Sequence, residues 1–340
     1  MKEALLKYDF TDNGLNIGDY IQSLAAKQFL NNQENPYLIS RESLNDYDGE
    51  QVKLIMNGWF LMNGQNFPPS NKIKPLLVSH HINISVHSYF KEEKVINFYK
   101  KNEPIGCRDY FTLEFLESLG VKCYYTGCLT LTLSEKYKSD KKNDHIYFVD
   151  PRYKKVEGFF ADVSRLYILA TKFSTISTIR SRYIRSNNKK SWRKTLDFYQ
   201  TFSQLFEDKV LREAIYIKHY IPASKFNDDS EIFAHAEELL RKYASAKYVV
   251  TSRIHCALPS ISLGTPTLYI DIPNDHDISS CRLNGIKDFF HIIHTNVKKI
   301  SCDLLKNSEK FTIKSTFSNK NDFFEIKEKI KKTVIDFIKN

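Results

Sequence analysis

The sequence predicts an α/β protein with two domains, each built on a parallel β-sheet. A chain of 340 residues exceeds what one hydrophobic core usually organises, so two domains are the first expectation. Strand-like and helix-like stretches alternate along the first half, with short connections between them. A second series of the same kind begins near residue 145. Alternation of this kind favours parallel sheets whose two faces are covered by helices.

In the first half, residues 3–9 are expected to form a strand, and apolar residues at helical spacing follow it over 20–30. Residues 109–119 predict a helix that Asp109 would cap and that Gly120 would end. Five short runs have the composition of strands: VKLIMNG, LLVSH, INISVHS, EPIGC and VKCYY. We expect these elements to form the first domain, residues 1–142.

The second series begins with the strand-like HIYFVD and continues through a basic helical segment over 152–212. A strand in EAIYIKHYIP and a helix over 231–244 follow. The stretches AKYVVTS, RIHCALPSISLG and TPTLYID then predict a compact strand–helix–strand unit. We expect a second domain over 143–315. The remaining residues, 316–340, predict an amphipathic helix that packs back on the first domain.

The composition is that of a globular protein, with 42% hydrophobic and 26% charged residues. The first ten residues contain four charged side chains and no apolar signal-peptide core. The longest uncharged run, residues 254–270, is interrupted by Pro259, Gly264 and Pro266, so we expect no membrane span. The six cysteines have no zinc-type spacing, and we expect reduced thiols and no metal. A cytoplasmic protein is predicted.

Positive charge is concentrated in one block. Between residues 152 and 194 there are twelve basic residues and two acids, which equals the formal net charge of +10. Such a block is suited to nucleic acid, an anionic membrane surface or a lipid diphosphate, and a solvated segment between domains is the alternative. Its densest part holds seven basic residues: Arg180, Arg182, Arg185, Lys189, Lys190, Arg193 and Lys194.

The most informative stretch is VVTSRIHCALPSISLGTP. A strand is expected to end at Thr251, and a helix to begin within Arg253-Ile254-His255. Helix N-termini bind anions through unpaired N–H groups, and an arginine adds a fork that grips phosphate or carboxylate. A histidine at this place is suited to proton transfer. Alternatively, His255 is a structural residue of a core helix.

Two further strand ends carry polar residues. Arg108 and Asp109 follow the strand-like EPIGC, so two arginines could hold a small anion with several charges. An ion pair between Arg108 and a neighbouring carboxylate is the alternative. Near the start of the chain, Asn16, Gly18 and Asp19 form a loop without the glycine pattern of a dinucleotide site. Asn57 and Trp59 lie in a similar predicted loop, and His80 follows the next strand.

Three motifs in this order resemble the polysaccharide pyruvyltransferase family: N-x-G-D at 16–19, G-x-R-D at 106–109 and S-R-x-H at 252–255. The last motif is followed by Ala257, Gly264, Pro266 and Ile270 at the spacing of that family. The resemblance covers residues 10–290. It implies a fold similar to GT-B glycosyltransferases, with two Rossmann-like domains facing a central cleft. It also implies transfer of pyruvate from phosphoenolpyruvate to a sugar as a cyclic ketal, without a metal or organic cofactor.

The resemblance also implies roles for individual residues. His255 would be the general acid/base, and the donor would be bound by Arg108, Ser252, Arg253 and Ile254. The acceptor sugar would meet Asn16, Gly18, Asp19, Asn57, Trp59, His80 and Arg282. Members of the family often act on lipid-linked oligosaccharides, so the basic block would contact the inner membrane surface or a lipid diphosphate. We then expect no nucleic acid partner.

Two other functions remain open from the residues alone. A GT-B glycosyltransferase that uses a nucleotide sugar would have the same architecture, so the fold does not separate it from a pyruvyltransferase. It would need a base and ribose site, where this chain offers two arginines and a histidine. A non-catalytic protein that binds anions or RNA through the basic block is the second alternative. In that protein, loss of His255 would leave binding unchanged.

Overall fold

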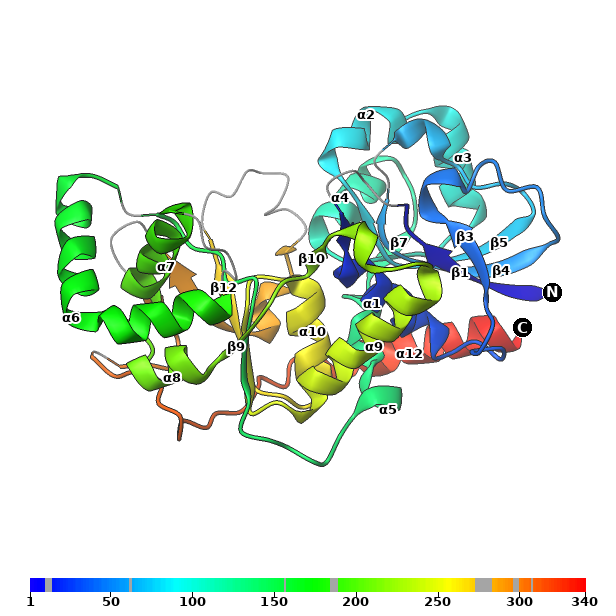
Figure 1. Cartoon of the computed structure of the whole chain (residues 1–340). Helices are drawn as coiled ribbons and strands as arrows, with labels where there is room; N and C mark the ends of the chain where they lie inside the picture. Colours follow the sequence, from blue (N-terminus) through cyan, green and yellow to red (C-terminus); the bar gives the residue numbers. More distant parts are fainter. Residues whose placement is uncertain are drawn as a thin grey trace.

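The fold is an α/β architecture with two six-stranded sheets, consistent with two Rossmann-like domains (Figure 1). The computed structural model describes residues 1–9, 14–60, 63–155, 157–183, 189–272, 283–295, 300–306 and 308–340, except for the side chains of residues 189 and 190. One sheet comes from the first third of the chain and the other from residues beyond 145. The fold class expected from the sequence is confirmed.

The first sheet is entirely parallel, in the order β3-β1-β4-β5-β6-β7. Asp109 caps α4 as expected, because its carboxylate accepts the Thr112 N–H at 2.9 Å. The strands are β1 (Lys2–Lys7), β3 (Tyr37–Ser40), β4 (Val52–Phe60), β5 (Ile73–Ile82), β6 (Ile105–Cys107) and β7 (Cys123–Tyr125). The helices are α1 (Ile17–Lys27), α2 (His87–Phe90), α3 (Glu93–Lys101) and α4 (Tyr110–Ser118).

Two predictions for the first half are wrong. The run INISVHS is not a strand, because the Asn83 side chain accepts the Ser85 N–H and starts a 3-10 turn over Ile84–Val86. Residues 57–59 are not a loop, since β4 continues through them to Phe60. A register irregularity between Met56 and Gly58 lets the strand continue past the glycine.

The second sheet has the order β14-β13-β12-β11-β8-β9 and is parallel except for its edge strand β14. The strands are β8 (Ile146–Val149), β9 (Ile215–Ile217), β11 (Tyr248–Thr251), β12 (Thr267–Asp271), β13 (His291–Thr295) and β14 (Ile300–Cys302). The helices are α6 (Phe159–Tyr183), α7 (Lys189–Phe202), α8 (Asp208–Glu213), α9 (Asp229–Ser245) and α10 (Ile254–Ser262). The predicted unit of β11, α10 and β12 is present.

Both sheets follow the same winding scheme. In the first sheet, β3 lies on one side of β1 and the later strands lie on the other side. In the second sheet, β9 lies on one side of β8 and the later strands lie on the other side. The winding therefore reverses between β1 and β4, and again between β8 and β11. Ligands of open parallel sheets bind at the carboxyl ends of the strands that flank such a reversal. A ligand-binding site is therefore expected at the residues that follow β8 and β11.

Segments from the two halves of the chain are joined near the start of α1. The short strand β2 (Leu15–Asn16) pairs antiparallel with β10 (Tyr220–Ile221), and the Ile17 N–H donates to the His219 carbonyl at 2.9 Å. The pairing requires a glycine at position 14, where φ is +115° and a Cβ would lie 2.5 Å from the Ile221 carbonyl oxygen. Helix α9 packs on α1 in the same hydrophobic core.

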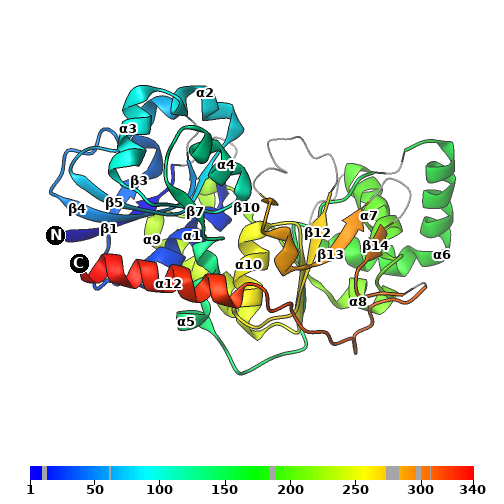
Figure 2. The same ribbon diagram turned by 180° about the vertical axis from the view of Figure 1, so that it is seen from behind.

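The chain ends in α12 (Phe324–Lys339), which runs along the first sheet when the molecule is viewed from behind (Figure 2). Its residues Ile330, Val334 and Ile338 belong to the same core as the first sheet. Lys53 Nζ donates to the Ile338 carbonyl at 2.9 Å. The domain boundaries near residues 142 and 315 stay predictions. Among the described helices, none combines the length and the apolar character needed to cross a bilayer.

The packing of α12 leads to a test of stability. We expect Ile330→Ala, at a side chain that is 2% exposed, to lower the free energy of unfolding by about 2–5 kcal/mol, because it leaves a cavity in the core. Urea unfolding followed by circular dichroism measures the change. Glu328→Ala, on the exposed face of the same helix, is the control and should shift the value by less than about 0.5 kcal/mol. Equal effects of both substitutions would contradict this packing.

Candidate active site

The S-R-x-H motif lies at the carboxyl end of β11, where the sheet reverses its winding. Arg253 is the N-cap of α10 in extended conformation, and its N–H donates to Thr251 Oγ1 at 2.9 Å. The N–H groups of Cys256 and Ala257 donate back to the Arg253 carbonyl. The first N–H groups of a helix have no partner within the helix, so this turn presents them toward the strand ends. The predicted strand–Ser–Arg–x–His–helix arrangement is therefore present.

Asp150, directly after β8, organises this strand end. Its Oδ2 accepts a charge-assisted hydrogen bond from Arg253 Nε at 2.8 Å and another from the His219 N–H at 3.0 Å. Its carbonyl oxygen accepts from the Ser252 hydroxyl. The backbone of Asp150 is left-handed, with φ of 40°, a conformation that is uncommon outside glycine. Sequence analysis did not single out Asp150, although the Asp-Pro pair after HIYFV marks a strand end.

Arg253 remains available for a ligand. Only its Nε is used by Asp150, and neither Nη group donates to a residue of the described ranges. The side chain is 34% exposed, so its outer edge reaches solvent. The Asp150 bond thus orients a guanidinium whose two Nη groups remain suited to bidentate binding of an anion.

A small cavity of about 40 Å³ lies beside Arg253. It lies where the N-termini of two helices meet, since Asn16 caps α1 and Arg253 caps α10. A Cβ at Gly18 would lie 3.2 Å from His255 Cβ, so glycine allows α1 to approach the histidine closely. The positive ends of two helix dipoles and two arginines favour a small anion here. Its lining residues are Asn16, Gly18, Arg152, His219, Ser252, Arg253, Ile254 and His255.

A larger cavity of about 740 Å³ adjoins the small one, because Arg152 and Arg253 line both. Arg193 and Lys194, from the densest part of the basic block, lie in its wall together with Lys155. Burial, followed by the charges of Lys218 and Lys155, lowers the pKa of Lys194 below its ordinary value. Cations crowded together in this way favour a bound anion. The larger cavity therefore extends the anion-binding site outward from Arg253.

Arg108 lies apart from these cavities, at the carboxyl end of β6 in the first sheet. It is 2% exposed, and its Nε lies 3.5 Å from Asp109 Oδ2. Burial raises the pKa of Cys128 above its ordinary value, and the charge of Arg108 opposes this rise. Cys128 packs in one cluster with Ile254 of α10. Arg108 therefore lies on the first-sheet side of α10. The ion-pair alternative considered for Arg108 is present in the structure.

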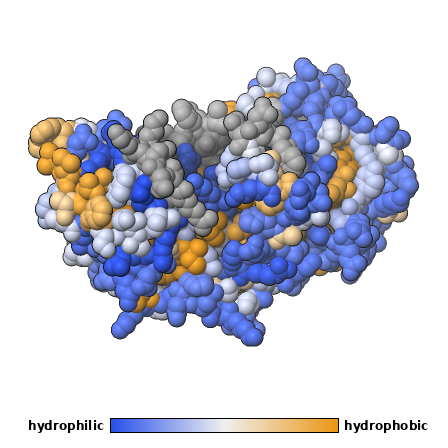
Figure 3. All heavy atoms as spheres, viewed as in Figure 1, coloured by the Kyte–Doolittle hydropathy of each residue, from blue (hydrophilic) through white to orange (hydrophobic). Residues whose placement is uncertain are grey.

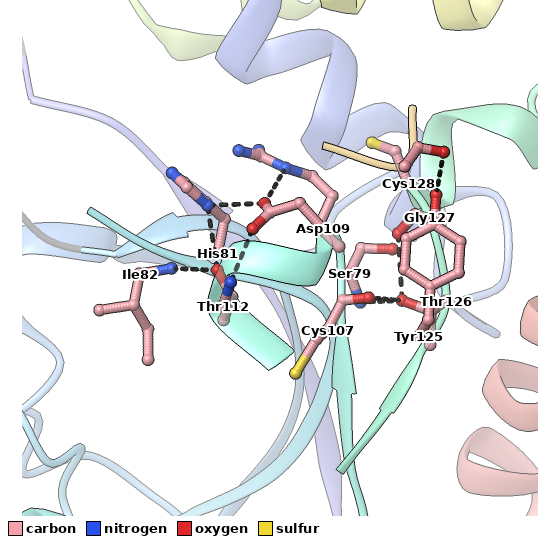
Figure 4. Close-up of polar contacts among 12 residues, drawn as sticks. Ser79, His81, Ile82, Cys107, Asp109, Thr112, Tyr125, Thr126, Gly127 and Cys128 are labelled. Atoms are coloured by element: carbon pink, nitrogen blue, oxygen red, sulfur yellow. Dashed lines mark hydrogen bonds and ion pairs between the residues drawn. The ribbon is translucent and has the colours of Figure 1, made fainter. Parts of the chain in front are cut away.

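Asp109 belongs to a buried polar network that Figure 4 shows. Its Oδ2 lies 2.7 Å from His81 Nδ1, and the same nitrogen lies 3.1 Å from the Thr112 hydroxyl. Burial alone would raise the pKa of the Asp109 carboxyl, but the charges of His81 and Arg108 lower it below its ordinary value. His81 was missed in the sequence because its neighbour His80 has the same local pattern. This network holds the strand end that carries Arg108.

The residues expected to meet the acceptor divide into two groups. Asn16 and Gly18 line the small cavity, as described above. Asp19 accepts from Gln22 Nε2 at 3.1 Å, and Asn57, which is 2% exposed, donates to the Gln22 carbonyl at 2.9 Å. Neither residue lines the two cavities. Arg282 lies outside the described residues.

The two remaining acceptor residues, Trp59 and His80, have structural partners. The Trp59 ring packs on the guanidinium of Arg41 at 4.8 Å. His80 is fully buried, stacks on Phe60 and lies 2.9 Å from the Tyr99 hydroxyl. Neither lines the two cavities. We therefore leave His80 out of the site proposed below, because a ligand would have to displace core side chains to reach it.

The basic block does not form one continuous surface. Arg180 Nε donates to Ser191 Oγ at 2.8 Å, and its guanidinium lies over the Trp192 ring, so it holds α6 against α7. Arg182 is exposed, whereas Arg193 and Lys194 line the larger cavity. Arg185 and the side chains of Lys189 and Lys190 lie outside the described residues.

Two Rossmann-like halves with an anion pocket at the junction of their segments are typical of enzymes that act on charged substrates. The family of polysaccharide pyruvyl transferases matches residues 16–274, and the chain belongs to this family. It is therefore a transferase, as its motifs indicated. A search of curated proteins finds no match. One solved structure, a functionally uncharacterised protein from Klebsiella pneumoniae, is 14% identical over 84% of this chain and 88% of the other, with a TM-score of 0.40.

Two buried histidines predict how stability depends on pH. Burial lowers the pKa of both His80 and His219 to about 3, while an unfolded chain has the ordinary value of about 6.5. The unfolded state therefore binds more protons below pH 6.5, so stability is complete above that pH and decreases as the pH falls toward 3. Each histidine should remove about 2 kcal/mol between pH 6.5 and pH 5.

Urea unfolding at several pH values measures this dependence. His219→Gln keeps a polar group beside Tyr243, which lies 2.7 Å from the His219 ring, but it does not titrate. We expect the variant to lose roughly half of the histidine-dependent change between pH 6.5 and 5. An unchanged pH dependence would contradict the buried neutral state of His219.

Proposed function

We propose that this transferase moves pyruvate from phosphoenolpyruvate to a sugar of a bacterial surface polysaccharide precursor, forming a cyclic pyruvate ketal and releasing phosphate. The acceptor is proposed to be lipid-linked, with a 4,6-ketal on galactose or another hexose. The single observation that carries the proposal is the small cavity, where two helix N-termini, Arg253 and His255 meet. These groups are suited to binding a small anion next to a group that transfers a proton.

The donor would bind at the start of α10. Ser252, the Ile254 backbone and the Nη groups of Arg253 line the cavity or its edge, and together they suit a phosphate or carboxylate. Arg108 is proposed as the second arginine for the donor. Because it is now buried beside Asp109, this contact requires the first sheet to shift relative to α10. Of the proposed acceptor residues, Asn16 and Gly18 line the same cavity.

In the proposed mechanism, His255 supplies a proton to the vinyl carbon of phosphoenolpyruvate, which leaves an oxocarbenium-like centre at the neighbouring carbon. A sugar hydroxyl attacks that centre and gives its proton to His255, which is neutral after the first step. A second hydroxyl then forms another C–O bond as the C–O bond to phosphate breaks, and its proton leaves with the phosphate as hydrogen phosphate. Arg253 and the helix N-termini stabilise the charge of the departing phosphate. The net reaction consumes one phosphoenolpyruvate and two hydroxyl groups and gives one ketal and one phosphate.

Replacement of the proposed acid/base tests this mechanism. We expect His255→Ala to lower acceptor-dependent phosphate release from phosphoenolpyruvate by about 10²- to 10⁴-fold, the usual contribution of general acid–base catalysis. The assay uses a panel of galactosides, mannosides and lipid-linked sugars. His145→Ala is the control, because His145 is an exposed residue just before β8, at the amino end of that strand.

The same panel separates the alternatives. If phosphoenolpyruvate fails to bind while a nucleotide sugar binds, the protein is a GT-B glycosyltransferase. If no acceptor gives phosphate release in the wild type and His255→Ala leaves ligand binding unchanged, the non-catalytic anion-binding alternative is supported instead. Acceptor-dependent phosphate release that is lost only in the His255 variant supports the proposed reaction.

The Asp150 carboxylate provides a second test. Asp150→Asn keeps an oxygen that can accept from Arg253 Nε but removes the negative charge, so Arg253 is held less firmly. We expect the KM for phosphoenolpyruvate to rise about tenfold, with a smaller change in kcat. Steady-state kinetics at varied phosphoenolpyruvate measure both constants, and thermal unfolding confirms that the variant is folded. A folded variant with an unchanged KM would show that Asp150 does not orient Arg253 for the donor.

A further inference from the structure

The first half of α6 carries an unusual number of exposed apolar side chains. Six of the twelve large apolar side chains that are exposed among the described residues belong to this helix. Their exposed fractions range from 47% to 87%, so about half or more of each side chain is in contact with solvent and not with the core. Figure 3 shows an orange patch at the left edge of the molecule, where Figure 1 shows α6 as the outermost helix. The six are Phe159, Phe160, Val163, Leu166, Tyr167 and Phe173.

Residues 159, 163 and 166 and residues 160 and 167 lie on two adjacent rows of one helix face. Phe173 lies beyond the non-helical Lys172 and stacks on Trp192. The inward side of α6 is held by Ile168 and Leu169, which pack against the core of the second sheet, and by polar contacts. Arg165, which is 5% exposed, binds Asp197 of α7 at 2.6 Å, and Ser164 accepts from Gln200 Nε2 at 3.1 Å. The outward apolar side chains are therefore additional to those that α6 buries against the core of the second sheet. We call the five outward residues 159, 160, 163, 166 and 167 the α6 ridge.

Positive charge lies next to the α6 ridge. The described residues 152–155, 157 and 158 lie between the larger cavity and the start of α6. They contribute the exposed cations Arg152 and Lys155 and one exposed acid, Glu157. Arg193 and Lys194, also exposed, lie in the same cavity wall. Two acids nearby are already paired, because Asp162 and Asp197 both bind Arg165 at 2.6 Å. The surface beside the ridge is thus cationic.

From this juxtaposition we propose that the α6 ridge inserts into the interface of an anionic phospholipid bilayer, while the cations of the larger cavity contact lipid phosphates. An aromatic and aliphatic helix face flanked by Lys and Arg is the type of surface that binds membrane interfaces. The cavity leads from this surface to Arg253, so a lipid-linked acceptor would reach the pyruvyl site from the membrane. The docking itself rests on α6 and its surroundings and not on the donor chemistry.

A second copy of the chain is a less suitable partner for the ridge. A symmetric dimer through α6 would bring the cationic surfaces of both copies together, and like charges repel across an interface. An anionic bilayer instead neutralises the same cations, and it needs no complementary groove to receive a convex helix. Charge therefore favours the bilayer over self-association.

Vesicle co-sedimentation of the full chain tests the proposal. We expect binding to vesicles with phosphatidylglycerol in phosphatidylcholine, and at least tenfold weaker binding to phosphatidylcholine alone. The variant Phe159→Ser/Phe160→Ser/Leu166→Ser should bind the anionic vesicles at least tenfold more weakly than the wild type. The variant Lys155→Gln/Arg193→Gln should bind several-fold more weakly and respond less to added salt, because fewer charges are screened.

The matched control is Tyr37→Ser/Ile84→Ser/Phe324→Ser, which removes three exposed apolar side chains elsewhere and should bind vesicles like the wild type. Phosphate release with a water-soluble acceptor should be the same in the ridge variant and the wild type. That assay reports on the proposed reaction, and co-sedimentation reports on docking, so each can fail without the other.

Two results would overturn the proposal. The first is vesicle binding that is absent in the wild type or equally strong in the ridge variant. The second is a dimer in sedimentation velocity that the ridge variant dissociates, which would assign the ridge to self-association.

Discussion

The candidate site depends on the hydrogen bonds that the Asp150 carboxylate accepts. The carboxylate binds Arg253 Nε and the His219 N–H, and the His219 carbonyl in turn accepts the Ile17 N–H at the start of α1. One acid therefore links the ends of β8 and β11 to a helix of the first half. It leaves the Nη groups of Arg253 for a ligand, and its left-handed backbone turns the chain away from the sheet.

The repeated winding of the two sheets explains why the site lies where it does. Each sheet has a reversal point, and that of the second sheet brings Asp150 and Ser252-Arg253 side by side although about a hundred residues separate them. The pairing of β2 with β10 then delivers Asn16 and Gly18 to the same place. The larger cavity extends outward from Arg253 toward α6. The proposed donor site lies in the small cavity, and the larger cavity joins it to the surface beside α6, where we propose that a membrane binds.

The predictions that succeeded depended on local patterns. The strand–helix–strand unit around S-R-x-H could be predicted because an apolar run, a helix start and a Gly-x-Pro turn follow one another within twenty residues. Asp109 was recognised as a cap for the same reason. INISVHS failed because Asn83 caps a turn at this position, a local hydrogen bond that alternation of apolar residues does not reveal. The burial of His80 beside Tyr99 could not be predicted in this way, because it depends on the packing of the whole sheet.

The amino-acid sequence by itself determined the α/β class, the two series of elements, the family and the motif that begins α10. Periodicity and short motifs predict these properties, because both kinds of pattern are formed by residues close together in the sequence. The tertiary structure alone decided that Asp150 holds Arg253, that Arg108 is buried against Asp109 and that α6 exposes five apolar side chains on one face. Each of these facts depends on contacts between segments far apart in the chain, and a linear pattern cannot specify which distant partner a side chain meets.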